Sequence, residues 1–200
     1  MKISSLSLQL VAVTVLTTGA AWAQNTVAEQ DQQRDINQQQ RIEQGLQSGQ
    51  LTTREAGSLE RQQQHIDNME ARDLKKGPMT AAEQRKLDAA QNRASNSIYA
   101  DKHNGATGNP NSASSQRMQA DVQRNVNQQK RIQNGMDNGS LTNHEAGSLE
   151  KGQAHVNRRE ANAAANGHVG AGEQRRIQRS ENHQSGRIYR KKHNAVTKAG

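Results

Sequence analysis

Histidine and glutamate residues recur in this chain at positions that lie 90 residues apart. Imidazole nitrogen binds zinc, manganese and other divalent transition metals, and a carboxylate oxygen adds a ligand that suits manganese. No histidine has a second histidine or a carboxylate three or four residues away, so a metal site would have to form between helices. The candidate metal ligands are Glu55, His65, Glu83 and His103, followed by Glu145, His155, Glu173 and His193.

These residues predict a protein that binds a divalent transition metal, either manganese or zinc, for scavenging, buffering or sensing. The second half of the chain adds His144, His168 and His183, so we expect the stronger site there. The alternative is that the histidines are ordinary polar residues on helix surfaces.

A basic cluster near the C-terminus indicates a second kind of ligand. It contains Arg187, Arg190, Lys191 and Lys192, whereas the segment 90 residues earlier is nearly neutral. Such a cluster predicts docking on an acidic surface, such as an envelope or outer-membrane protein, with an affinity that falls in salt. Aromatic residues for base stacking are absent there except Tyr189, which argues against specific nucleic-acid binding. A solvated helix end remains the alternative.

Composition and motifs argue against an enzyme. The chain has no cysteine and no phenylalanine, and hydrophobic residues make up 30% of it. It contains no G-x-S-x-G or H-E-x-x-H motif and no phosphate-binding glycine loop. An apolar substrate pocket is difficult to build from such a sequence.

The chain contains the same unit twice. Residues 31–104 and 121–194 align without a gap, and 34 of the 74 aligned positions are identical. The first copy carries 11 basic and 11 acidic residues, whereas the second carries 13 basic and 7 acidic residues. This divergence predicts a ligand or partner specific to the second copy.

Apolar residues in each copy follow a helical period, as Ile36, Ile42 and Leu46 show in the first segment. Alternating β-branched runs are absent, so the predicted fold class is all-α. Each copy is expected to form a three-helix module, helix–loop–helix–loop–helix. The segment 105–120 between the copies is rich in Gly, Asn and Ser at its start and predicts a flexible linker.

Four loops share a glycine, an apolar residue two positions later and a glutamate six positions later, as in Gly49, Leu51 and Glu55. This pattern resembles the second half of an EF-hand calcium loop, and the chain is similar to a degenerate EF-hand-like tandem repeat of small exported proteobacterial proteins. No activity is assigned to that repeat. The early ligand positions carry no carboxylate in any of the four loops, which argues against calcium. In three loops a threonine stands three residues before the glutamate and predicts a helix capping box, which Gly170 breaks in the fourth.

The N-terminus reads as a signal peptide over residues 1–23. Lys2 precedes an apolar stretch, and Ala21-Trp22-Ala23 matches a cleavage site. The predicted location is therefore the periplasm of a Gram-negative cell or the medium, with no membrane span after signal removal.

Overall fold

The computed structural model describes the chain from residue 19 to 194 except residue 78, and the side chains of residues 19–27 and 29 are not described. Within this part the protein is all-α, as predicted, with six α-helices and no strand. The elements are α1 (Gly19–Ser48), α2 (Thr53–Lys76), α3 (Ala81–Lys102), α4 (Ala113–Asp137), α5 (Asn143–Ala163), the 3₁₀ turn η1 (Ala164–Asn166) and α6 (Ala171–Lys192). Most of the predicted signal peptide lies outside the described residues.

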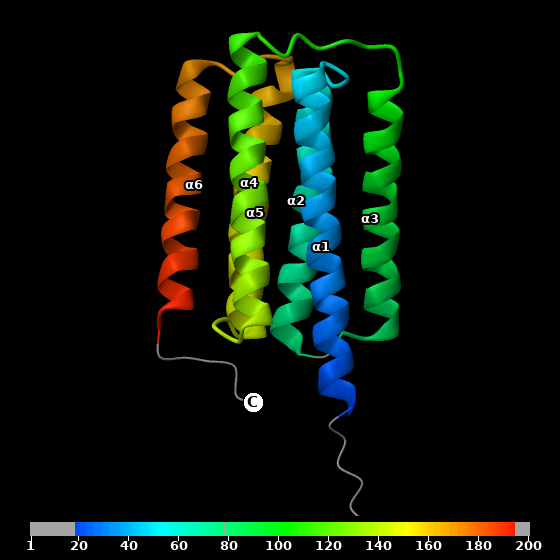
Figure 1. Cartoon of the computed structure of the whole chain (residues 1–200), viewed down its shortest axis with the longest axis vertical. Helices are drawn as coiled ribbons and strands as arrows, with labels where there is room; N and C mark the ends of the chain where they lie inside the picture. Colours follow the sequence, from blue (N-terminus) through cyan, green and yellow to red (C-terminus); the bar gives the residue numbers. More distant parts are fainter. Residues whose placement is uncertain (1–18, 78, 195–200) are drawn as a thin grey trace, which may run out of the picture.

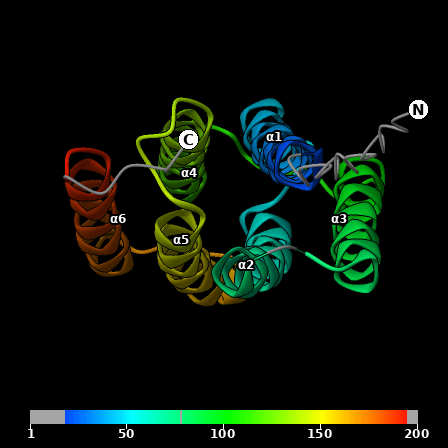
Figure 2. The ribbon, with the colours of Figure 1, turned by 90° about the horizontal axis from the view of Figure 1, so that it is seen from below.

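Four helices form the centre of the molecule. Seen along the helix axes, α1, α2, α4 and α5 form a bundle, with α3 on its outer side next to α1 and α2 (Figure 2). Helix α6 lies on the opposite side, next to α4 and α5 (Figure 1). Helix α1 packs on α4, and α2 packs on α5. Each central helix of the first copy therefore contacts its own counterpart in the second.

The Ala-Gly-Ser-Leu block of each copy makes the close contact between α2 and α5. A Cβ atom on Gly147 would lie 3.0 Å from the backbone oxygen of Ala71. In the reciprocal contact, a Cβ atom on Gly57 would lie 3.5 Å from the backbone oxygen of Ala161. Gly147 is the counterpart of Gly57 in the second copy, and Ala161 is the counterpart of Ala71. The same contact therefore occurs twice, with the roles of the two copies exchanged. Glycine is needed here because a side chain would separate the helices.

The two copies share their apolar core. One buried cluster combines Ile42 and Leu59 from the first copy with Val122, Val169 and Ile177 from the second. The expected linker is partly ordered, because α4 begins at Ala113, so residues 113–120 are helical. Its N-cap, Ser112, accepts a hydrogen bond from the backbone N–H of Ser115, which explains this early start.

The helix caps follow the sequence prediction. Capping boxes form at Thr52, Thr80 and Thr142, each with the glutamate three residues later. At the fourth loop only half of the box remains, because Gly170 has no side chain and its N–H donates to Glu173 Oε2 at 2.9 Å. No described helix combines the length and the apolar character needed to cross a bilayer.

Candidate functional site

The four glutamates predicted as metal ligands lie at helix N-termini. In the first loop, Glu55 Oε2 accepts hydrogen bonds from the N–H and the hydroxyl of Thr52, at 2.9 and 2.8 Å. Glu83 and Glu145 make the same contacts to Thr80 and Thr142. Hydrogen bonds from Thr80 and Lys76 lower the pKa of Glu83 to about 2. These carboxylates therefore stabilise helix starts.

The four predicted histidine ligands are exposed. His103 and His193 stack on Tyr99 and Tyr189, with ring centroids 4.2 Å apart in both pairs. His155 accepts a hydrogen bond at Nε2 from the Nε of Arg159 at 3.1 Å. Among the described residues, none of the eight predicted ligands, His65 included, belongs to a group of three metal-ligating side chains. The structure thus does not bring the predicted metal site together.

The predicted basic cluster is divided between two places. Arg187 is half-buried between α5 and α6, where its Nη2 donates to the backbone oxygen of Ser148 at 2.8 Å. Arg190 is exposed near the end of α6. Lys191 lies 3.8 Å from Glu145, and Lys192 donates to the backbone oxygen of Arg131.

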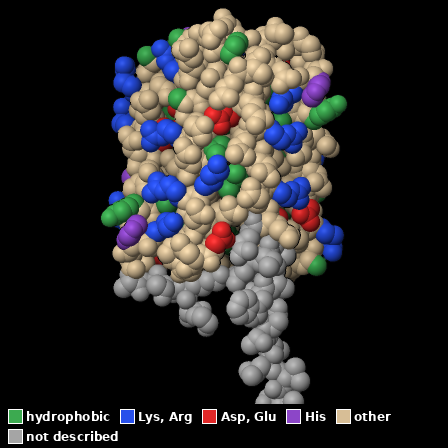
Figure 3. Space-filling view, viewed as in Figure 1, with side chains coloured by type: hydrophobic (Ala, Val, Ile, Leu, Met, Phe, Trp, Pro, Cys, Tyr) green, Lys and Arg blue, Asp and Glu red, His purple; other side chains and the backbone are tan. Residues whose placement is uncertain are grey.

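The interior contains carboxyl groups that the sequence analysis did not single out. Acidic side chains are sparse on the face shown in Figure 3. Eight are at most 2% exposed: Asp35, Glu60, Asp67, Glu70, Asp121, Glu150, Glu160 and Glu181. Among the ion pairs of the described residues, only that between Arg124 and Glu181, at 3.1 Å, involves one of these eight. Buried carboxylates are costly unless a cation, a proton or a hydrogen-bond donor compensates them.

Hydrogen-bond donors are too few for these groups. In the described part of the chain, 17 buried side-chain polar atoms have no hydrogen-bond partner, and all 17 are oxygens. Buried polar atoms in folded proteins are normally paired, so this one-sided surplus of acceptors requires an explanation. Either protons on the carboxyl groups or a bound cation would supply the partners that these oxygens lack.

Three of the buried carboxylates converge. Asp35 lies on α1, and Asp67 and Glu70 lie on one face of α2 because they are three residues apart. Each of the three offers a carboxylate oxygen, and these oxygens lie within 4.8 Å of one another. We call these three residues the acidic triad.

Each residue of the acidic triad has one partnered oxygen. Asp35 Oδ1 accepts from Gln91 Nε2 at 3.0 Å, and Asp67 Oδ2 accepts from Asn157 Nδ2 at 2.8 Å. Gln32 Nε2 approaches Glu70 Oε2 at 3.4 Å. The second oxygens, Asp35 Oδ2, Asp67 Oδ1 and Glu70 Oε1, accept no hydrogen bond from an amide or a hydroxyl group. Asp35 and Glu70 hydrogen-bond to each other when one of them carries a proton. Amide donors thus fix the orientation of each carboxylate and leave one oxygen available for a cation.

Burial makes the ionised form of the acidic triad unfavourable. It raises the pKa of Asp35 to about 7 and raises the pKa values of Asp67 and Glu70 well above their usual range. Repulsion from Glu150 adds to the increase for Asp67 and Glu70. The acidic triad therefore holds protons at neutral pH, unless a cation replaces them.

The second copy has lost this arrangement. Asn125, Asn157 and Glu160 occupy the positions that are equivalent to the acidic triad. There Asn125 Nδ2 donates to Glu160 Oε2 at 2.8 Å, so an amide supplies the donor that the first copy lacks. The signal in the sequence was the difference between the copies, two aspartates exchanged for two asparagines.

Comparisons of the chain with protein-family models, with curated proteins and with solved structures found no match.

Proposed function

We propose that this protein is an exported, non-enzymatic binding protein of two helical modules, and that its acidic triad binds a divalent metal ion. One observation carries the proposal. Three carboxylates meet within 4.8 Å, each with an oxygen that accepts no hydrogen bond from an amide or a hydroxyl group, in an interior whose unpartnered atoms are all oxygens. Scavenging, buffering or sensing of the metal outside the cytoplasm is the role that follows.

The donor set favours a hard cation. Carboxylate oxygens suit manganese, magnesium and calcium, whereas zinc in proteins usually has nitrogen or sulfur ligands. Metal–oxygen bonds of about 2.0–2.6 Å place opposite ligands roughly 4–5 Å apart, which matches the spacing of the acidic triad. Gln32, whose Nε2 reaches both Glu70 and Glu150, has a further unpartnered oxygen, Oε1. Manganese, magnesium and calcium all fit this donor set, and manganese is the ion used in the tests below.

Metal binding would also stabilise the fold. The acidic triad joins α1 to α2, and Asn157 connects it to α5. An ion that binds the folded chain and not the unfolded chain stabilises it by about 3 kcal/mol at a hundredfold excess over Kd.

Titration calorimetry of the tag-free protein with manganese at neutral pH tests the proposal. We expect one binding site per chain, and its affinity should collapse in the double variant Asp35→Asn with Asp67→Asn. This variant places in the first copy the amides that the second copy has as Asn125 and Asn157. The fold accommodates these residues, so lost binding would not reflect lost structure, and circular dichroism checks this.

The matched control removes histidines instead. His155→Ala with His193→Ala should leave manganese binding unchanged, because both side chains are exposed and neither belongs to a group of three metal-ligating side chains. Binding that is lost in the histidine variant and kept in the aspartate variant would refute the interior site. An affinity weaker than about millimolar, or roughly 4 kcal/mol, would refute metal binding altogether.

A further inference from the structure

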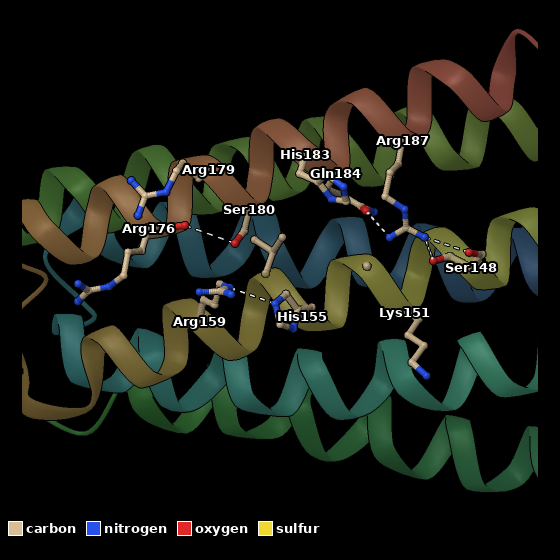
Figure 4. Close-up of a pocket in the computed structure, with 12 residues that line it drawn as sticks. Ser148, Lys151, His155, Arg159, Arg176, Arg179, Ser180, His183, Gln184 and Arg187 are labelled. Atoms are coloured by element: carbon tan, nitrogen blue, oxygen red, sulfur yellow. Dashed lines mark hydrogen bonds between the residues drawn. The ribbon is translucent and has the colours of Figure 1, made fainter.

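A groove between α5 and α6 concentrates positive charge in the second copy. Its volume is about 700 Å³, and side chains from both helices line it (Figure 4). Its cationic residues are Lys151, Arg159, Arg176, Arg179 and Arg187. No acidic residue lines the groove, and none of the five forms an ion pair with a carboxylate among the described residues. We call this feature the basic groove.

The first copy has no such groove. The equivalent hollow between α2 and α3 measures about 260 Å³. Met69, Ala89 and Ser97 stand there at the positions of Arg159, Arg179 and Arg187. Gln62 stands at the position of Gly152, where even a Cβ atom would collide with the side chains of Gln184 and Arg187. Three arginines, and a glycine over which the side chains of Gln184 and Arg187 pack, therefore distinguish the second copy.

Two of the arginines are held in place. The Nη2 of Arg187 donates to the backbone oxygen and the hydroxyl of Ser148 at 2.8 and 3.0 Å, and its Nη1 donates to Gln184 at 3.2 Å. Arg159 donates from Nε to His155 Nε2, which requires a neutral imidazole. Burial and the positive charges of Arg159 and Arg158 lower the pKa of His155, in agreement with this pairing. The terminal nitrogens of Arg159 remain available for a ligand.

We propose that the basic groove binds a soluble chain of linked phosphate groups. The cations of α6 extend from Arg176 to Arg187, a rise of about 16 Å along the helix, which is longer than one phosphate group. In a linear chain each internal phosphate carries two terminal oxygens and one negative charge, and each end group carries a third terminal oxygen, so successive groups can accept from arginines of both helices along the groove. No Phe, Tyr or Trp lines the groove, which disfavours nucleic-acid bases.

Calorimetry of the full chain with short inorganic polyphosphate, without added metal, tests this inference. The groove variant Arg159→Met, Arg179→Ala and Arg187→Ser installs first-copy residues and removes three charges. We expect an affinity loss of about tenfold or more, and a salt dependence whose slope decreases by about one for each arginine removed.

The charge-matched control is Arg190→Ala with Lys191→Asp, which also changes the net charge by three and installs the first-copy residues Ala100 and Asp101. It should change binding much less than the groove variant. Gly152→Gln narrows the groove with an added side chain and without a change of charge, and it should also weaken binding. The inference is overturned if the two charge variants lose equal affinity, or if the narrowed groove binds as tightly as the original. Equally tight binding of polyglutamate would show that the groove does not select phosphate.

Discussion

Raising the pH should destabilise the metal-free protein. Burial raises the pKa of Asp35 from 3.8 to about 7 and that of Glu150 from 4.5 to about 8. Above about pH 5 both groups are ionised in the unfolded chain, whereas the folded protein still holds both protons. Because the folded state binds more protons, its free energy of unfolding falls as the pH rises through this window.

The magnitude follows from the two retained protons. Each lowers the free energy of unfolding by about 1.4 kcal/mol per pH unit, so two protons lower it by about 5 kcal/mol between pH 5 and 7. A domain of this size shifts its Tm by about 2–4 °C per kcal/mol, which gives a decrease of roughly 10–20 °C. The other buried carboxyl groups act in the same direction.

Thermal melts followed by circular dichroism, in buffers with a chelator, measure this effect. A saturating manganese concentration should then raise the Tm at about pH 8 and leave it unchanged at about pH 5, where protons occupy the carboxyl groups. The variant Asp35→Asn with Asp67→Asn should show a smaller pH dependence and no response to manganese. A Tm of the metal-free protein that stays constant or rises from pH 5 to 8 would refute the reasoning. Equal stabilisation by manganese at both pH values would show that the ion binds outside the acidic triad.

Three further predictions concern the fold. Gly147→Ala should destabilise the protein by about 1–3 kcal/mol in denaturant melts, because the added Cβ meets the backbone oxygen of Ala71 at 3.0 Å. Gly186→Ala on half-buried α6 backbone should be neutral or stabilising, because its added Cβ meets only the flexible end of Arg190. Gly170→Thr should complete the fourth capping box and stabilise by about 1 kcal/mol, since Gly170 already has the extended backbone of the other N-caps; a loss of stability would contradict this. Limited proteolysis should cut the exposed segment 103–107 first, and the two fragments should elute together in gel filtration because the copies share a core; separate elution would show independent modules.

The sequence predicted the local structure well. The helical period of Ile36, Ile42 and Leu46 identified the fold class, and the capping boxes located three helix starts. These features depend on residues close together in the chain. The end of the predicted linker 105–120 lies within α4, because Ser112 caps this helix earlier than expected, and the flexibility of the linker stays a prediction.

The interior was harder to predict because its residue types are usually exposed. Glu60, Gln63 and Glu70 are charged or polar, yet they are buried on the same helix as Leu59 and Ile66. The second copy has the same residue types at the equivalent positions, Glu150, Gln153 and Glu160, and this repetition was a signal in the sequence that these residues share a structural role. The contact between α2 and α5 places these residues inside, and no local pattern specifies that contact. The histidines attracted attention as metal ligands by residue type, although all four shared histidines are exposed.

X-ray diffraction from crystals grown with manganese, measured for its anomalous signal, tests the central claim most directly. The account predicts one strong anomalous peak between α1 and α2, within bonding distance of Asp35, Asp67 and Glu70. Crystals of the variant Asp35→Asn with Asp67→Asn should lack it. A peak at the exposed histidines, or no peak at saturating manganese, would contradict the account.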